Sequence, residues 1–278
     1  KTAKTDILQS DCAFYIANCA VRLNQQNADQ LVESFVADYP TSTKRNTAFV
    51  DVADYYFTNG KYAYAKKWYD KVDDAGLARG DKEKFYFNNG YVAFTTQDYK
   101  SAKTYLSRVE NSKKYGSQSK YYIGFMAYQS DDYDKANEYF NQVSDEEKYK
   151  EKLSYYQADL HFKLGKFEKA IEFGLPLLEN EKGLEHSEIS KIVGESYFNL
   201  KKYEDAIITL DQALEIKPDF PDAFMNKGIA LIELGKSELA LECFQKAISL
   251  NPQMNEARLQ LAAIYNSTGR ESEAIAAL

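Results

Sequence analysis

Small and apolar residues recur along this chain at a helical spacing, and the whole pattern repeats as a block. From Ser187 to Met254 two copies follow one another, and corresponding residues lie 34 positions apart. The matched pairs are Gly194 and Gly228, Ala206 and Ala240, Leu210 and Phe244, Ala213 and Ala247, and Pro218 and Pro252. A third copy starts at Asn255 and has its small residues in the same places. A period of this length is typical of stacked helix–turn–helix repeats.

Each copy places suitable residue types where a helical hairpin needs them. A small residue at repeat position 8 allows the first helix (helix A) to approach the second (helix B), and Ala at position 20 makes a second close contact. Gly near position 15 suits a turn with positive φ, and Pro near position 32 ends helix B. One hairpin cannot bury its own apolar face, so the repeats should stack.

The array extends to the amino-terminal side when each copy is aligned on its position-20 alanine. These anchors are Ala28, Ala65, Ala102, Ala136, Ala170, Ala206, Ala240 and Ala274. Their spacings of 34 to 37 residues predict seven whole repeats and a truncated eighth. The predicted repeats cover about 9–42, 46–79, 83–116, 117–150, 151–184, 187–220, 221–254 and 255–278.

Three places depart from the regular pattern. The first repeat is degenerate, with Ile16 and Cys19 predicted to fill the core positions of helix A. In the fifth repeat, Gly174 and Pro176 should kink helix B or end it early. Leu278 falls inside the eighth repeat with no polar capping helix after it, which indicates a fragment of a longer protein or an end that pairs with something.

The period and the Gly, Tyr and Ala positions resemble the tetratricopeptide (TPR) repeat. The resemblance implies an all-α fold, a right-handed α-solenoid of about eight helix–turn–helix repeats, with a concave groove that binds proteins or peptides. Twenty of the 23 tyrosines lie at or before Tyr156. Residues 1–207 resemble long tyrosine-rich TPR proteins of Bacteroidota, and residues 208–278 resemble generic consensus repeats, so a compositional seam lies near 207. The first resemblance implies a periplasmic or envelope-associated protein; a cytoplasmic one is the alternative.

Composition and charge narrow the classes of partner. The net charge of −7 and the pI of about 5.1 argue against a nucleic-acid backbone or an anionic membrane surface as the main partner. No apolar run approaches the roughly 20 residues that a membrane-spanning helix needs. Cys12 and Cys19 are seven residues apart on one predicted helix, so their Cα atoms should lie about 10 Å apart. A disulfide requires less than about 7 Å, and this pair should stay reduced.

No set of residues predicts catalysis, a cofactor or a metal. The segment Gly228 to Ser237 contains two glycines followed by Lys and Ser, but six residues separate the glycines where a phosphate loop has four. Those six residues belong to a predicted helix. The two histidines are His161, at a core position of helix A, and His186, in a linker. We therefore expect no enzymatic activity.

The candidate binding residues are those of helix A that should face the groove, at repeat positions 2, 5, 9, 12 and 13. In the middle repeats they are mostly aromatic, with acids beside them: Asp54, Phe57, Phe87, Tyr91, Phe94, Tyr121, Phe125, Tyr128, Tyr155, Asp159 and Phe162. An aromatic run over several repeats indicates a binding surface for a protein or peptide. The alternative is that these rings pack against the next helix A.

The later repeats differ at the same positions. Lys191, Glu195 and Phe198 come from the sixth repeat, and Met225, Ile229 and Ile232 from the seventh. Some TPR proteins bind the terminal carboxylate of a partner through Lys and Asn at such positions. Here Lys191 is the lone basic residue, so that use is not expected. A second hypothesis for the whole chain is self-assembly, in which the uncapped carboxy-terminal repeat stacks on another copy.

Overall fold

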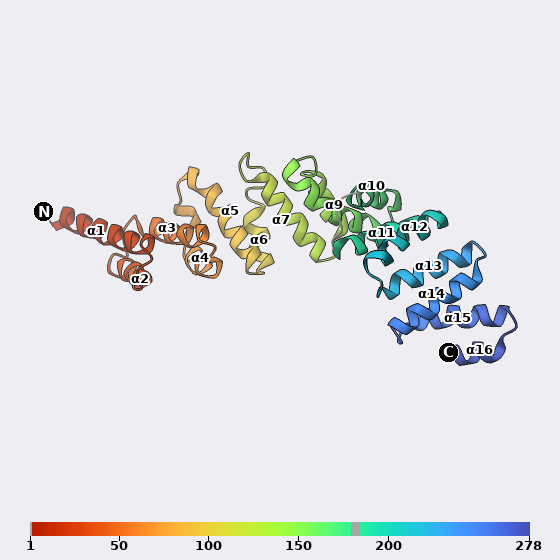
Figure 1. The fold of residues 1–278 in the computed structure, drawn as a ribbon. Coiled ribbons are helices and arrows are strands. Elements are labelled where there is room, and N and C mark those ends of the chain that lie inside the picture. Colours follow the sequence, from red (N-terminus) through yellow and green to blue (C-terminus); the bar gives the residue numbers. More distant parts are fainter. Residues whose placement is uncertain (1, 179–183) are drawn as a thin grey trace. The chain divides into compact units, whose positions relative to one another are not determined.

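A computed structural model describes residues 2–178 and 184–278, and these residues are all-helical, as the sequence predicts (Figure 1). They form sixteen α-helices and one short 3-10 helix, η1. The helices are α1 (Thr2–Arg22), α2 (Ala28–Asp38), α3 (Arg45–Thr58), α4 (Tyr62–Tyr69), η1 (Asp74–Gly76), α5 (Arg79–Thr95), α6 (Tyr99–Leu106), α7 (Gly116–Gln129), α8 (Tyr133–Asn141), α9 (Glu147–Lys163), α10 (Phe167–Leu178), α11 (Leu184–Asn199), α12 (Tyr203–Ile216), α13 (Pro221–Glu233), α14 (Ser237–Leu250), α15 (Asn255–Ser267) and α16 (Glu271–Ala277).

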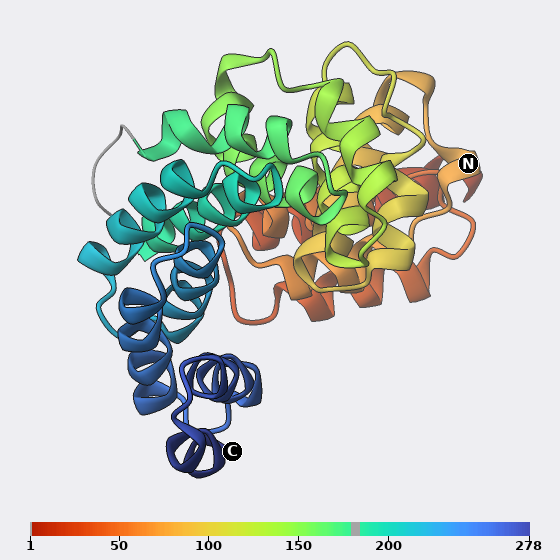
Figure 2. The same ribbon diagram turned by 90° about the vertical axis from the view of Figure 1, so that its right-hand side faces the viewer.

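The chain divides into two compact parts, residues 1–130 and residues 131–278. The first contains α1 to α7 and the second contains α8 to α16. In Figure 2 successive helices of the second part lie side by side as hairpins. The division falls between α7 and α8, inside the predicted repeat 117–150, and not at the compositional seam near 207.

The turn between helices A and B has the same backbone conformation in all eight hairpins. One residue in each turn has a positive φ between 53° and 74°. Four of these residues are glycines and four are not: Gly60, Gly165, Gly235, Gly269, Asn24, Gln97, Asp131 and Lys201. The glycines adopt this conformation without steric cost, whereas the other four bear the strain of a Cβ in the left-handed region.

Glycine at repeat position 8 is required by the close approach of helix B. A Cβ on Gly228 would lie 2.6 Å from Cε1 of Phe244, and a Cβ on Gly194 would lie 2.8 Å from Cγ of Leu210. A Cβ on Gly90 would likewise lie 2.7 Å from Cγ of Leu106. The bulky residue at position 24 therefore occupies the space that the missing side chain leaves. This confirms the close contact that the repeat pattern predicts.

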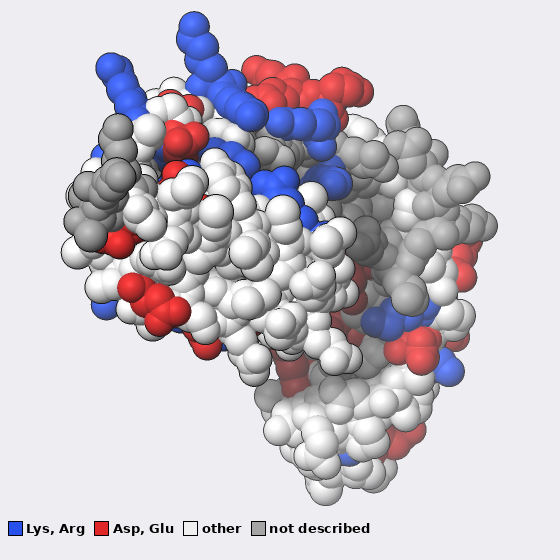
Figure 3. Space-filling view, turned by 90° about the vertical axis from the view of Figure 1, so that its left-hand side faces the viewer, with Lys and Arg blue, Asp and Glu red and all other residues white. Residues whose placement is uncertain are grey.

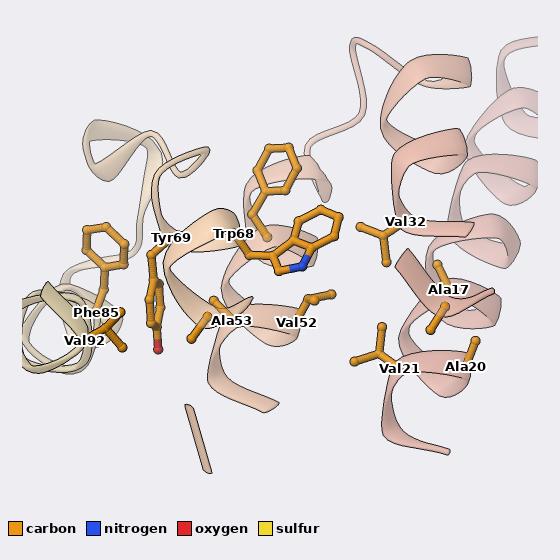
Figure 4. Close-up of a cluster of buried hydrophobic side chains, with 13 residues drawn as sticks. Ala17, Ala20, Val21, Val32, Val52, Ala53, Trp68, Tyr69, Phe85 and Val92 are labelled. Atoms are coloured by element: carbon orange, nitrogen blue, oxygen red, sulfur yellow. The ribbon is translucent and has the colours of Figure 1, made fainter. Parts of the chain in front are cut away.

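Seven of the eight anchor alanines are buried between the helices, and Ala274 is partly buried. Large side chains fill the space around them. In residues 1–130 the core cluster runs from α1 to α5, with Trp68 and Tyr69 of α4 at its centre (Figure 4). Trp68 and Ala65 are both completely buried. Because side chains from neighbouring hairpins share this cluster, each hairpin is stabilised by the next.

In residues 131–278 a similar cluster joins α13 to α16. Phe244 and Ala240 are completely buried there, and Cys243 belongs to the same cluster. Cys12 and Cys19 are free cysteines, in agreement with the helical spacing.

Ile16 and Cys19 do not fill the core of the first hairpin, so that prediction is wrong. Both are exposed, and Ile16 has 60% of its surface accessible. The buried stripe of α1 runs through Phe14, Ala17 and Val21, which lie three and four residues apart. The degenerate first repeat carries two apolar stripes, and the sequence pattern alone did not distinguish them.

The sequence predicts a kink or an early end of α10 at Gly174 or Pro176, and the early end does not occur. The helix continues through Pro176 to Leu178. Gly174 is needed for packing, because a Cβ on it would lie 2.5 Å from Cγ2 of Val193 in α11. Residues 179–183, which follow α10, lie outside the described residues.

Candidate functional site

Six half-buried aromatic rings form a continuous cluster over three hairpins of the first part of the chain. We call it the aromatic cluster; it consists of Phe57, Tyr62, Tyr91, Phe94, Tyr122 and Phe125. Helices α3, α5 and α7 supply five of the rings, and α4 supplies Tyr62. The sequence therefore predicted four members of the cluster, Phe57, Tyr91, Phe94 and Phe125. It did not predict Tyr62 and Tyr122.

The rings of the aromatic cluster touch one another edge-on or tilted. The centroid of Tyr91 lies 5.7 Å from that of Phe57, and Tyr91 lies 5.2 Å from Tyr122. Phe94 is 4.8 Å from Tyr122 and 5.8 Å from Phe125. These are favourable aromatic geometries, which contribute stability beyond apolar burial. Each ring is thus fixed by its neighbours while part of its surface stays accessible.

Two predicted groove residues are used in the interior instead. Phe87 is 7% exposed and stacks on Tyr115, with the ring centroids 4.7 Å apart. Asp54 accepts hydrogen bonds from Tyr69 Oη at 2.5 Å and Asn88 Nδ2 at 2.9 Å, and it pairs with Lys84 Nζ at 2.6 Å. Burial, followed by the nearby Asp54 charge, strongly raises the pKa of Tyr69. Asp54 therefore joins neighbouring hairpins and is occupied by these contacts.

The remaining predicted residues are half-buried. Tyr121 and Tyr128 lie on α7, and Tyr155 and Phe162 lie on α9. Tyr121 touches Tyr122 of the aromatic cluster, with centroids 5.3 Å apart. Asp159 pairs with Lys163 one turn along α9, at 2.8 Å. Tyr121 and Tyr128 belong to the first part of the chain, and Tyr155, Asp159 and Phe162 belong to the second.

A pocket opens on the helix A side of the sixth and seventh hairpins, and we call it the Glu195 pocket. It has a volume of about 230 Å³ and is lined by Glu195, Phe198, Asn199, Asn226 and Ile229. Helix α11 supplies the first three residues, and α13 supplies the last two. Three of the five are at predicted groove positions, but none was among the candidate binding residues chosen from the sequence. The sequence prediction included neither Asn199 nor Asn226, although Asn226 lies at position 6 of helix A and could have indicated the pocket.

Glu195 is held in this pocket by hydrogen bonds and is largely removed from water. Its Oε1 accepts a hydrogen bond from Asn226 Nδ2, and its side chain is 19% exposed. Lys191 Nζ lies 3.9 Å from the same oxygen. Burial raises the pKa of Glu195, and Lys191 and Asn226 oppose that shift. The pocket thus contains a carboxylate whose charge is only partly balanced.

His161 has the structural role expected from its core position. It is 1% exposed and stacks on Phe173 of α10, with ring centroids 5.4 Å apart and planes 13° apart. Burial, with smaller contributions from Lys169 and Lys166, lowers the pKa of His161 to about 4. The imidazole is therefore neutral near pH 7.

In residues 2–178 and 184–278, no group of three or more His, Cys, Asp or Glu side chains could hold a metal ion. None of the helices in these ranges is both long enough and apolar enough to span a bilayer.

Apolar side chains are also exposed at the first and last hairpins. Figure 3, seen from the side of α1, shows a broad surface without charged groups. Leu8, Tyr15 and Ile16 are exposed on α1 and Leu23 is exposed directly after it, and Ile275 and Leu278 are exposed at and after α16. Scattered exposed apolar residues are ordinary, but a stripe along one helix is characteristic of a covered face.

Comparison with protein families gives three matches. The family described as "Tetratricopeptide repeat" matches residues 221–254, and "TPR repeat" matches residues 194–235. The family "Anaphase-promoting complex, cyclosome, subunit 3" matches residues 129–213.

Individual relatives are similar over parts of the chain. Small glutamine-rich tetratricopeptide repeat-containing protein 2 of Mycosarcoma maydis is 28% identical over 98 residues, which are 35% of this chain and 28% of that protein. Mitochondrial import receptor subunit TOM70 of Saccharomyces cerevisiae is 30% identical over 82 residues, 30% of this chain and 13% of TOM70. The chain thus spans less than a third of the length of these curated relatives.

The solved structure of MamA 41-end from Desulfovibrio magneticus RS-1 has a similar fold. It superposes with a TM-score of 0.54 at 19% identity, over 64% of this chain and 99% of that one. The likeness confirms the predicted all-α solenoid.

Proposed function

Because this chain belongs to the tetratricopeptide repeat family, we propose that it is a non-enzymatic scaffold that binds a peptide or protein segment on the helix A side of its repeats. TPR proteins are generally scaffolds of this kind. One relative is named as a subunit of a mitochondrial import receptor, which agrees with a role in protein binding.

The observation that carries the proposal is the aromatic cluster. Its rings are prearranged by contact with one another and still keep accessible surface. Rigid aromatic side chains lose little conformational entropy when they bind a partner, and they are enriched among the residues that dominate binding energy. Packing between hairpins explains the ring contacts, but it does not by itself require half-exposed rings over three successive hairpins.

Three alanine variants of the aromatic cluster, each on a helix A, separate binding from packing: Tyr91→Ala, Tyr122→Ala and Phe125→Ala. The protein is first used to select binders from a phage-displayed random dodecapeptide library, and the affinity of each variant for the selected peptides is then measured. A central aromatic residue of an interface should lose about 2 kcal/mol or more, roughly a thirtyfold weaker Kd.

The matched control is Phe140→Ala, because Phe140 is a completely buried ring outside the aromatic cluster. It should lower the free energy of unfolding by about 3–5 kcal/mol without altering peptide affinity in the folded fraction. If the three helix A variants behave like Phe140→Ala, their rings are core and the proposed binding face is wrong.

Self-assembly is a second candidate, and the exposed apolar stripe of α1 favours it. The stripe is formed by Leu8, Tyr15 and Ile16, and Ile275 is exposed on α16. Contact between these two different faces would be head-to-tail and would produce open chains of molecules. Analytical ultracentrifugation over a wide concentration range tests this: association that Ile16→Lys abolishes supports stacking, and a monomer at all concentrations contradicts it.

We further propose that the chain is part of a larger envelope-associated TPR protein. The support is the resemblance of residues 1–207 to tyrosine-rich repeat proteins that are generally exported. Fractionation of the source cells, followed by detection with an antibody against these residues, would place the protein. Recovery in the cytoplasmic fraction would contradict an envelope location.

A further inference from the structure

The Glu195 pocket combines three kinds of side chain that can all interact with the same ligand group. It contains a carboxylate, an aromatic ring and two side-chain amides. The ring is Phe198, which is steadied by Tyr203 with centroids 5.5 Å apart. A carboxylate attracts a cation, and an aromatic face attracts a cation through its quadrupole.

The charges around the pocket leave the carboxylate only partly neutralised. Lys191 is the nearest cation, but its Nζ lies between two acids, 3.9 Å from Glu195 Oε1 and 3.5 Å from Asp222 Oδ2. One positive charge therefore faces two negative ones. The group is still short of one positive charge, and a cation within about 4–6 Å would favour the charged form of the Glu195 carboxylate.

The oxygen atoms of Glu195, Asn199 and Asn226 are placed to accept hydrogen bonds from a ligand. Asn226 donates its amide to Glu195 Oε1, and Asn199 donates its amide to the carbonyl oxygen of Glu195 at 2.8 Å. Within the described residues, no hydrogen bond is made to Glu195 Oε2. This oxygen and the two amide oxygens can therefore accept from a ligand with several N–H groups.

We propose that the Glu195 pocket binds an arginine side chain of the peptide held on the helix A side. The guanidinium stacks on Phe198 and donates to Glu195 Oε2 and to an amide oxygen, while its aliphatic stem lies against Ile229. Lysine fits less well, because its ammonium is a compact, strongly hydrated charge that cannot stack as a plane. This inference rests on the proposed function, since it names the chemistry of the peptide.

The volume of the pocket agrees with a single side chain. At about 230 Å³ the pocket is smaller than the roughly 300–1,000 Å³ of sites for drug-sized ligands. It also differs from a site for a terminal carboxylate, because Glu195 would repel that group. The pocket therefore selects for a cation, and the acid at position 9 of helix A sets this preference.

The first experiment probes the pocket without a peptide. The side-chain amides of Asn199 and Asn226 are followed by NMR in the whole chain during titration with Nα-acetyl-arginine methylamide. Saturable, millimolar shifts are expected, with much weaker shifts from the neutral citrulline analogue. Equal responses to both compounds, or no response to either, would overturn the inference.

The second experiment uses the dodecapeptides that the whole chain selects from the random library. The selected peptides should contain an arginine whose replacement by citrulline weakens binding at least tenfold. Glu195→Gln should weaken binding by a similar factor and remove the difference between the arginine and citrulline peptides.

Glu188→Gln is the matched control, because Glu188 lies on the same helix but pairs with Lys217 at 3.6 Å and does not line the pocket. It should leave affinity unchanged. Peptides that bind well without a basic residue, or equally well to Glu195→Gln, would disprove the arginine site while leaving the scaffold function intact. Failure to select any peptide would count against the proposed function, and the NMR titration would still decide the pocket.

Discussion

Acid should destabilise this protein through His161, well before most carboxylates are protonated. The imidazole is 1% exposed and stacks on Phe173, and burial lowers its pKa from the ordinary 6.5 to about 4. In the unfolded chain the same group takes up a proton near pH 6.5. The unfolded state therefore binds more protons between pH 6.5 and 4, and stability falls as the pH falls through that window.

The size of the effect follows from these two pKa values. At pH 5 the unfolded histidine is almost fully protonated and the folded one is mostly neutral, so linkage removes about 2 kcal/mol relative to pH 8. At pH 7 the loss is still only a few tenths of a kcal/mol. Above pH 8 this group contributes no further change. The stabilisation is thus fully present above the ordinary pKa.

Urea denaturation followed by circular dichroism at pH 7.5 and pH 5.0 measures the loss directly. The perturbation is His161→Phe, which keeps a ring against Phe173 and removes the titrating group. The variant should lose about 2 kcal/mol less than the wild type between the two pH values. The control is His186→Gln, which removes the other histidine of the chain and should keep the loss.

An independent NMR titration of the His161 ring protons should give a pKa near 4. A midpoint above 6, or an equal acid loss in wild type and His161→Phe, would show that the ring is accessible to water in the folded state. The packing of α9 against α10 would then be looser than the burial indicates.

Three further changes test the repeat geometry and the pocket. Gly228→Ala should lower the free energy of unfolding by about 1–3 kcal/mol, because its Cβ would lie 2.6 Å from Cε1 of the buried Phe244. The control Gly80→Ala should not destabilise the protein, because no atom lies within 4 Å of the added Cβ. Equal urea midpoints for both variants would refute the close approach. Gln97→Gly should raise the free energy of unfolding by about 0.5–1 kcal/mol, because φ is 62° there; a lower melting temperature would show that this turn bears no strain. Glu195→Gln should be at least as stable as the wild type at pH 7.5, because burial raises the pKa of Glu195 and its charge is unfavourable in the folded state. That advantage should disappear as the pH falls below the ordinary value of 4.5; a variant less stable at pH 7.5 would refute this.

The candidate site was only partly predictable from the sequence. Phe57, Tyr91, Phe94 and Phe125 were found because repeat position alone places them on one side of helix A. Phe87 and Asp54 share that side, but Tyr115 covers the first and Tyr69, Lys84 and Asn88 occupy the second. Such contacts come from other helices, and a pattern along one helix contains no information about them.

The sequence by itself determined the all-α fold and the pairing of its helices. A period of 34 to 37 residues fixes where the chain turns and where a small residue of helix A faces helix B, because these local requirements recur along the array. Only the tertiary structure decided which stripe of α1 is buried, that α10 runs through Pro176, and that Glu195 meets Phe198 and Asn226 in one pocket. These features depend on what a neighbouring hairpin supplies, so they arise from packing between repeats rather than from the repeat itself.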